Sequence, residues 1–371
     1  MTRVPHTIIV FRTCGLGDFI LSIPAFVMLR RRFPAARIVL VTMSSTNAGV
    51  ASRVAAYAGG ATVAPWIELV PPGTIDDVVM IPSLRSLSAL VHARRTLRGL
   101  RPGLIVQMMD IGIPWRRRWK KMAFALALIG PVRQVGWRLR GSIERGDVPA
   151  IDPRLGHHVH GPLHFMRELF GPEAYDVNEI SPVANPGEEA RRWASQWIAD
   201  HTRGHPLIAI APGAIYPHKD WPIDRFAAVT RAILHDVPDA HIVVSGTRGD
   251  AAKADQLVAI DPARVISTCG TASILQSAAL FEQCTLVVGN DGGAMHLADA
   301  MGTKVVSIVP GLEFPISIEP WRNIDRAVRH RVACAPCYSF TSCPQGHNRC
   351  MQDLPVDAVL EQVRRALIES R

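Results

Sequence analysis

A glycine-rich turn near the start of the chain carries the first residue that could do chemistry, Asp18. The turn reads RTCGLGD from Arg12 to Asp18 and lies between an apolar run and a helical pattern. Gly15 and Gly17 permit tight turning and close approach of a ligand, and a helix start favours an anion. A dinucleotide fingerprint would need a third glycine, but Ile20 stands there. Asp18 is either a general base that takes a proton from an attacking hydroxyl or a helix N-cap, and the two roles are compatible.

A second glycine-rich segment, GNDGGAMH from residue 289 to 296, has the pattern of a diphosphate site. Gly292 and Gly293 let backbone N–H groups point at a diphosphate where the next helix begins. His296 could donate to a phosphate oxygen, and Asp291 could bond the helix amides or a ribose hydroxyl. The alternative is structural, with Asp291 as the N-cap of the helix and His296 as a packed side chain.

Two further segments follow predicted strands in the same half of the chain. In APGAIYPHKDWP, residues 211–222, Ala214 and Ile215 follow a Pro-Gly turn and Lys219 offers a point charge to a phosphate. In SGTRGD, residues 245–250, Thr247 and Arg248 could contact a base or a ribose. A solvated lysine and a plain surface loop are the alternatives. Because all three segments leave strands on one side of one domain, they favour a shared nucleotide site.

Four of the seven cysteines gather in one short segment: Cys334, Cys337, Cys343 and Cys350. Four thiolates close in sequence can hold a structural Zn or Fe ion, with His347 as a possible substitute ligand. Free or paired thiols are the alternative. The other cysteines, Cys14, Cys269 and Cys284, are interpreted as core or loop residues.

The stretch PWRRRWKKMAFALALIG, residues 114–130, places five positive charges and two tryptophans before an apolar run. This composition suits a segment that lies on anionic lipid. It also suits a grip on a phosphorylated acceptor, or an ordinary helix with a solvated basic end. No nucleic-acid reading motif accompanies it, so we expect no nucleic-acid partner.

The elements that must position these residues alternate between strands and helices. The predicted strands are 7–11, 37–42, 78–81, 104–108, 207–211, 241–245, 286–288 and 305–309, and the predicted helices are 19–33, 224–234, 274–283, 294–301 and 356–368. Strand and helix at this spacing indicate parallel sheets with helices on both faces. The polar run SPVANPGEE, from residue 181, is the best linker candidate.

The chain of 371 residues is too long for one ordinary core and suits two domains. We expect an α/β protein with two doubly wound, Rossmann-like domains that face a cleft, with ligands at the carboxyl ends of the strands. The expected boundaries are 1–180 for the acceptor-side domain, 181–190 for a linker, 191–352 for the nucleotide-binding domain and 353–371 for a closing helix.

Composition narrows the class of partner. The formal net charge of +9 favours an anionic partner such as nucleic acid, a phosphorylated glycolipid or an acidic membrane face. No apolar run reaches the roughly 18 residues of a spanning helix. The N-terminal run is interpreted as a strand rather than a signal peptide. We therefore expect a cytoplasmic protein whose cysteines are reduced or bind metal.

Three stretches, 12–34, 212–226 and 290–303, resemble the diagnostic stretches of the heptosyltransferase family, glycosyltransferase family nine. The last, NDGGAMHLADAMGT, is similar to the family pattern SNDTGPMHLAAALGT. The resemblance covers nearly the whole chain in the same order. It implies a GT-B fold and inverting transfer from ADP-heptose to the inner core of lipopolysaccharide. It also implies that catalysis requires no metal or other cofactor. Peripheral contact with the cytoplasmic face of the inner membrane is an expectation from the basic stretch 114–130.

The resemblance also implies roles for particular residues. Asp18 is the implied general base, and the implied donor-diphosphate site consists of Lys219, Asp291, Gly293 and His296. The sequence departs from the family at Gly292, where Thr is usual, and at Arg248, where a Glu that meets the nucleoside is common. A structural role for the cysteine segment is also implied. The alternatives are a family member with a protein or another surface glycan as acceptor, a GT-B-shaped sugar-nucleotide epimerase, and a non-catalytic sugar-nucleotide-binding protein.

Overall fold

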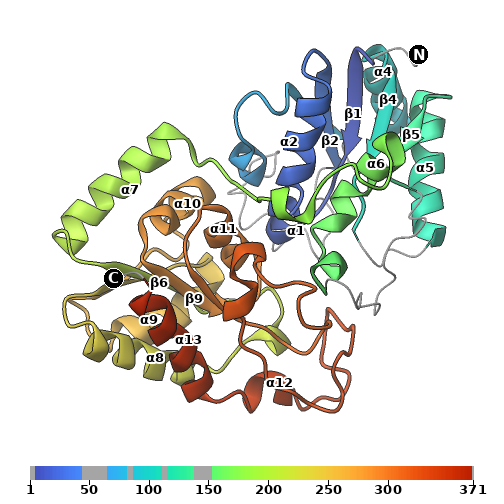
Figure 1. Ribbon diagram of the computed structural model, residues 1–371. Helices are drawn as coiled ribbons and strands as arrows, with labels where there is room; N and C mark the ends of the chain where they lie inside the picture. The colour runs from blue at the N-terminus through green and yellow to red at the C-terminus, as the bar shows by residue number, and fades with distance from the viewer. Residues whose placement is uncertain (1–4, 44–64, 82–86, 111–114, 138–152, 370–371) are drawn as a thin grey trace. The chain divides into compact units, whose positions relative to one another are not determined.

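The computed structural model describes residues 5–43, 65–81, 87–110, 115–137 and 153–369 (Figure 1). The chain divides into two compact units, Met1–Pro182 and Val183–Arg371. Each unit contains one five-stranded parallel sheet, as expected for an α/β chain. Among the described helices, none combines the length and the apolarity that crossing a bilayer requires.

The sheet of the first unit has the strand order β3-β2-β1-β4-β5. Its strands are β1 Thr7–Phe11, β2 Arg37–Met43, β3 Asp77–Ile81, β4 Leu104–Gln107 and β5 Gln134–Val135. Its helices are α1 Leu16–Ile20, α2 Ile23–Arg32, α4 Leu87–Gly99, α5 Trp115–Ile129 and α6 His160–Phe170, with short 3₁₀ turns at Pro65–Leu69, Pro153–Gly156 and Val177–Glu179.

Alternate residues of these strands fill two hydrophobic layers, because successive side chains of a strand point to opposite faces. On one face Ile9 and Ile105 pack with Leu97 of α4 and with Leu128 and Ile129 of α5. The intervening strand residues, Ile8, Val10, Ile38 and Leu40, are also fully buried. Burial on both faces explains the continuous apolar runs of the sequence, which are typical of parallel sheets.

The sheet of the second unit has the strand order β10-β9-β6-β7-β8. Its strands are β6 Leu207–Ala211, β7 His241–Val244, β8 Val265–Ser267, β9 Leu286–Asn290 and β10 Val305–Ile308. Its helices are α7 Gly187–Thr202, α8 Ile223–Asp236, α9 Ala251–Val258, α10 Ile274–Gln283, α11 Gly293–Ala300, α12 Arg349–Gln352 and α13 Val356–Ile368, with 3₁₀ turns η4 Pro217–Lys219, η5 Arg248–Asp250 and η6 Trp321–Arg326.

The two sheets have the same topology. Counted from the first strand of each unit, both run third, second, first, fourth, fifth. In such a sheet the chain changes direction between its first and fourth strands, and ligands bind beyond the carboxyl ends of the strands at that switch point. The switch points are therefore β1/β4 in the first unit and β6/β9 in the second.

Most predicted elements are confirmed, and the helices predicted at 274–283 and 356–368 have the observed bounds. The single helix predicted over 19–33 is wrong, because α1 ends at Ile20 and α2 starts at Ile23. Pro24 lies in the first turn of α2, and a proline ring clashes with the carbonyl four residues earlier. The sequence therefore contained the signal for this break.

Two further observations concern the expected boundaries. Helix α7 starts at Gly187, so the last residues of the expected 181–190 linker are helical. The expected closing helix, 353–371, is part of the second unit, because Val359 and Val363 of α13 are buried in its core with Ile308 of β10. The short strands β5 and β8 were not predicted, since two or three residues carry no recognisable alternation.

Candidate active site

At the switch point of the first unit, Arg12 joins the ends of β1 and β4. Its guanidinium is 2% exposed and lies 2.5 Å from the Asp110 carboxylate. It also donates to the main-chain carbonyl of Met108 at 3.3 Å and to that of Asp18 at 2.9 Å. A buried charge is stable only when it is paired and hydrogen-bonded. This clamp fixes the turn before α1 to the loop after β4.

Asp18 lies in the first turn of α1, and its residue is exposed to solvent. Its main-chain carbonyl also accepts from the Ser22 hydroxyl at 2.6 Å. The N-cap of α1 is Gly15, so the interpretation of Asp18 as N-cap is wrong. The main chain of Asp18 is thus held while its carboxylate lies at the surface, which is the arrangement that a general base needs.

Gly15 and Cys14 complete this turn. A Cβ atom added at Gly15 would meet no described atom within 4 Å, so the space beside it is open. Gly17 is the second residue of α1 and bonds Leu21 through its carbonyl. Burial raises the pKa of the Cys14 thiol to about 12, so it stays protonated at neutral pH and is no candidate nucleophile.

At the switch point of the second unit, Asn290 joins the loops after β6 and β9. Its amide donates to the Pro212 carbonyl at 2.8 Å and accepts from the Trp221 N–H at 3.1 Å. Lys253 of α9 reaches the same loop, with its ammonium 2.8 Å from Asp220 and 3.3 Å from the Pro212 carbonyl. The loop that carries Lys219 is thereby fixed from two sides.

Lys219 and Asp291 form a partly buried ion pair with Nζ and Oδ2 2.7 Å apart, in which Asp291 is only 4% exposed. Burial would raise the pKa of Asp291, but the charge of Lys219 and its hydrogen bond outweigh this effect and hold that pKa below its ordinary value. The N-cap of α11 is Gly292, so Asp291 does not cap this helix as the structural alternative required. Its partner is instead the lysine of the neighbouring loop.

His296 lies in the first turns of α11 and is nearly fully buried. Burial lowers its pKa, and Asp291 counteracts part of this effect. The imidazole is therefore neutral at pH 7, with one N–H to donate. Within the described part of the chain, its Nδ1 has no hydrogen-bond partner. Buried polar atoms are normally bonded, so this nitrogen points to a ligand.

Thr247 and Arg248 start the 3₁₀ turn η5 at the end of β7. Both the main-chain N–H and the hydroxyl of Thr247 donate to Asp250, at 2.8 and 2.6 Å. A Cβ atom added at Gly213 would lie 2.3 Å from the same carboxylate, so only glycine fits beside it. The hydroxyl of Thr247 thus has a structural bond in a capping box, whereas Arg248 is exposed.

The fold therefore brings most of the predicted donor-side residues to one switch point. Lys219 follows β6, Asp291 to His296 follow β9, and Ala214 and the exposed Ile215 lie in the loop fixed by Asn290. Sequence reasoning missed Asn290, Lys253 and Asp110. Asn290 and Asp110 both come within three residues of a strand end, and that position was the available signal.

The sequence profile of glycosyltransferase family 9 (heptosyltransferase) matches residues 107–346 of this chain. The chain belongs to glycosyltransferase family 9. It is 28% identical over 174 residues to lipooligosaccharide heptosyltransferase 2 of Campylobacter jejuni, and the match covers 45% of the chain and 53% of that relative. The chain thus spans about half the length of this relative.

Solved structures of family 9 share the whole fold. The E. coli ADP-heptose lipopolysaccharide heptosyltransferase II superposes with a TM-score of 0.67 at 17% identity, covering 98% of the chain and 99% of that structure. The family 9 protein of Veillonella parvula gives 0.70 at 19% identity, with 98% of each chain covered. The expected GT-B class, with two Rossmann-like units, is confirmed.

The cysteine segment of this family 9 chain lies against the loop after β10. The N–H groups of Cys337 and Tyr338 donate to the carbonyls of Gly311 and Leu312, at 3.1 and 2.9 Å. Burial raises the pKa of the Cys350 thiol, and the nearby Cys343, Cys337 and Cys334 raise it further. The Cys350 thiol is therefore close enough to the other three cysteines for them to act on it.

These cysteines are free thiols in the structure. The sulfur of Cys334 is 4.0 Å from His347 Nε2. Across the described residues, no three His, Cys, Asp or Glu side chains are arranged to hold a metal ion. The structural Zn or Fe site stays a prediction.

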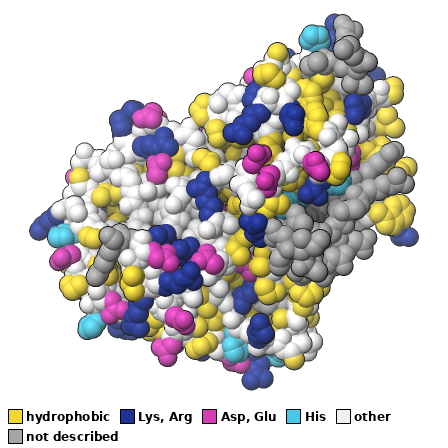
Figure 2. Space-filling view, viewed as in Figure 1, with side chains coloured by type: hydrophobic (Ala, Val, Ile, Leu, Met, Phe, Trp, Pro, Cys, Tyr) yellow, Lys and Arg dark blue, Asp and Glu magenta, His cyan; other side chains and the backbone are white. Residues whose placement is uncertain are grey.

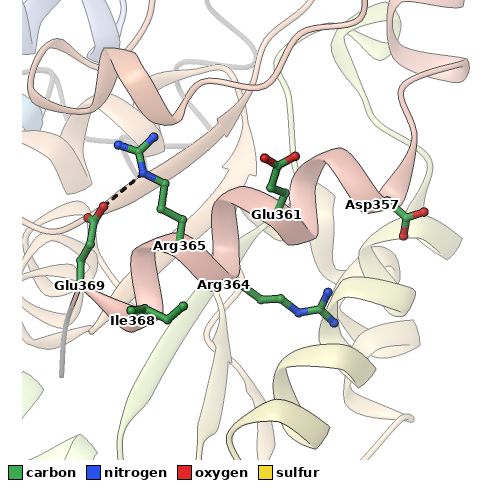
Figure 3. Close-up of a pocket in the computed structure, with 6 residues that line it drawn as sticks. All are labelled: Asp357, Glu361, Arg364, Arg365, Ile368 and Glu369. Atoms are coloured by element: carbon green, nitrogen blue, oxygen red, sulfur yellow. Dashed lines mark hydrogen bonds and ion pairs between the residues drawn. The ribbon is translucent and has the colours of Figure 1, made fainter.

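A surface hollow along α13 contains none of the predicted site residues (Figure 3). It is lined by Asp357, Glu361, Arg364, Arg365, Ile368 and Glu369. Its arginines already have partners, since Arg364 bonds Asp236 at 2.9 Å and Arg365 bonds Glu369 at 3.2 Å. The two arginines of this hollow are thus engaged in ion pairs with neighbouring carboxylates.

Proposed function

We propose that this family 9 chain is an inverting glycosyltransferase that moves a heptose from ADP-heptose to the inner core of lipopolysaccharide. The names of its relatives support the sugar and the acceptor class. The observation that carries the proposal is the exposed Asp18, whose main chain is clamped at the switch point of the first unit. A protein that only bound a sugar nucleotide would have no use for a base held in this way.

In the proposed reaction the Asp18 carboxylate takes the proton of the acceptor hydroxyl. The hydroxyl oxygen attacks the anomeric carbon from the face opposite the nucleotide, and the bond from that carbon to the diphosphate oxygen breaks. The configuration at the anomeric carbon is thereby inverted. ADP leaves as an anion, and no cofactor takes part in these steps.

The second unit supplies the stabilisation of the departing ADP. Lys219 has three N–H donors and gives one to Asp291, so the others remain for phosphate oxygens. The N–H of His296 and the backbone N–H groups that start α11 at Gly292 and Gly293 complete the set. Donors fixed in advance around developing charge are the largest usual contribution to such catalysis.

The acceptor and the site of action follow from the same proposal. The acceptor is an anionic glycolipid, which the net charge of +9 favours. The chain then works in the cytoplasm, at the inner face of the membrane, where a lipid-linked acceptor is within reach. Neither nucleic acid nor a metal ion at the reaction centre is part of this proposal.

The decisive variant is Asp18→Asn, which removes the base and keeps the size of the side chain. Turnover of ADP-heptose with a lipopolysaccharide-core acceptor should fall about 100-fold or more, while calorimetry should show unchanged affinity for ADP. Glu173→Gln, at an exposed carboxylate of the same unit, is the control and should leave turnover unchanged.

The products distinguish this activity from its rivals. NMR of the product should show an inverted anomeric centre, and no change of the donor should occur without acceptor. Conversion of donor alone would indicate an epimerase, and turnover of Asp18→Asn within a factor of about two of wild type would exclude Asp18 as the base.

A further inference from the structure

Helix α5 exposes an apolar stripe that the fold does not cover. Trp115, Trp119, Met122 and Leu126 are spaced four, three and four residues apart, which places them on one side of a helix. Trp115 is 70% exposed, Trp119 55% and Leu126 44%. Exposed tryptophans so close together are rare on a surface with no partner.

A different side of α5 packs into the first unit. Ala125, Leu128 and Ile129 are its buried residues, and the last two belong to the hydrophobic layer with β1 and α4. The stripe therefore contributes nothing to this core. Packing of the first unit therefore does not explain why apolar side chains are placed along this stripe.

Basic side chains share the first two turns of α5 with the stripe. Arg116, Arg117 and Lys120 are exposed, and the guanidinium of Arg116 lies 5.8 Å from the centre of the Trp115 ring. Helix α5 contains no acidic residue. In Figure 2, hydrophobic and basic side chains lie together at the edge of the first unit where α5 runs in Figure 1. Tryptophan beside arginine and lysine is the composition of helices that lie in a bilayer interface.

The first turns of α5 also lie near the clamp at the switch point. Lys121 is close enough to Asp110 and Arg12 for their charges to act on its ammonium. A surface bound by α5 would therefore lie near the carboxyl ends of the strands, where the turn with Asp18 follows β1.

We propose that α5 docks this chain on an anionic phospholipid bilayer, with the stripe in the interface and the exposed cations of the same turns on lipid phosphates. The positive charge of α5 favours an anionic bilayer as the partner, because each Lys or Arg near an anionic membrane surface contributes about 1 kcal/mol to the binding free energy. The proposal rests on the proposed function, since a lipid-linked acceptor has to be reached at a bilayer. Docking through α5 would place the turn with Asp18, the proposed base, near that acceptor.

Vesicle sedimentation tests the docking without donor or acceptor, so its failure is separate from a failure of transfer. Wild type should bind vesicles of phosphatidylcholine mixed with phosphatidylglycerol, and bind phosphatidylcholine alone weakly. Binding should fall as salt rises, because exposed charges are screened. The triple variant Arg116→Gln, Arg117→Gln, Lys120→Gln should bind the anionic vesicles about 100-fold more weakly.

A second triple variant, Arg192→Gln, Arg231→Gln, Arg331→Gln, is the matched control. It removes the same number of exposed cations from the second unit and should bind the vesicles as wild type does. The double variant Trp115→Ser, Trp119→Ser should lose the fluorescence quenching that brominated acyl chains cause in wild type. ADP binding checks that each variant is folded.

Two results would overturn the docking. The first is that the wild-type chain does not bind anionic vesicles at low salt. This includes the case in which α5 instead binds another copy of the chain or nucleic acid. The second is a control triple variant that loses as much binding as the α5 variant, since net charge alone would then explain the attraction.

Discussion

At the scale of single residues, the carboxylate of Asp291 decides the net charge at the switch point of the second unit. Asp291 is buried and sits between Lys219 and the neutral His296. It neutralises part of the lysine charge, so the pair costs less to bury than an isolated ammonium would. Under the proposed function, a diphosphate bound here would meet one cation and one neutral N–H donor, beside a loop fixed by Asn290.

Lys219→Ala and His296→Ala should each weaken ADP binding if both groups hold the diphosphate. The expected loss is about 1 to 3 kcal/mol for each variant, as for other charge-assisted hydrogen bonds. Calorimetry measures it. Lys253→Ala is the comparison, because Lys253 bonds the same loop through Asp220 and the Pro212 carbonyl. ADP affinity unchanged in both variants would remove the two residues from the site.

At the scale of elements, helix α11 carries a second buried carboxylate, Asp299. One of its oxygens, Oδ1, accepts from the main-chain N–H of Arg322 at 2.9 Å and from Asn323 Nδ2 at 2.7 Å. These bonds tie the end of α11 to the turn η6. Burial nevertheless raises the pKa of Asp299 from 3.8 to about 6, so its ionised form weakens the fold.

Asp299→Asn should stabilise the protein above pH 6. The folded pKa of about 6 is higher than the ordinary 3.8, so the favourable contribution of Asp299 is complete below pH 3.8 and lost as the pH rises through 6. An asparagine oxygen can accept both hydrogen bonds without a charge. The gain in unfolding free energy should reach at most about 3 kcal/mol and vanish in acid.

Denaturant unfolding across this pH range measures whether Asp299→Asn raises the free energy of unfolding. Asp236→Asn provides the opposite case, because the hydrogen bond from Arg364 holds the pKa of Asp236 below its usual value. That variant should lose stability at neutral pH and match wild type in acid. If the Asp299→Asn variant is less stable than wild type at pH 8, the predicted gain in unfolding free energy is contradicted.

The cysteine segment is the other element with a testable role. It hydrogen-bonds the loop after β10 through Cys337 and Tyr338, so a metal there would stabilise that loop without touching the reaction. We expect about one Zn or Fe ion per chain in protein purified without added metal. Cys337→Ser should then lower the melting temperature, while ADP binding at low temperature persists.

Elemental analysis decides the question. Cys269→Ala is the control, because this buried thiol belongs to the core around β7 and should not change the metal content. Metal-free protein with four titratable thiols in the segment would show that these are ordinary reduced cysteines.

For the whole molecule, the repeated topology explains why two different kinds of site occur in one chain. Each unit offers one switch point, and the two carry different chemistry. The first has an exposed carboxylate beside a clamped turn, and the second has a partly buried cation, a neutral histidine and a glycine-rich helix start. In the proposed function, the base and the diphosphate site thus come from two copies of one architecture, distinguished by the loops that follow the strands.

The sequence by itself determined the longer strands, several of the helices and the loops that follow the strands. Strands such as Thr7–Phe11 and Leu207–Ala211 were predictable because strands buried on both faces are continuous apolar runs. Glycines directly after such runs marked the turns at Gly15 and Gly292, because the ligand-binding loops of a parallel sheet follow its strands. These signals are local, so they need no knowledge of the fold.

Only the tertiary structure decided which residues meet. Lys219 pairs with Asp291 because β6 and β9 are neighbours in the sheet, although β7 and β8 separate them in the sequence. Arg12 reaches Asp110 for the same reason, across β1 and β4. The burial that makes His296 neutral, and the exposure that leaves the stripe of α5 uncovered, are likewise properties of packing. Strand order and burial depend on contacts between distant segments, and a local pattern of residue types does not contain them.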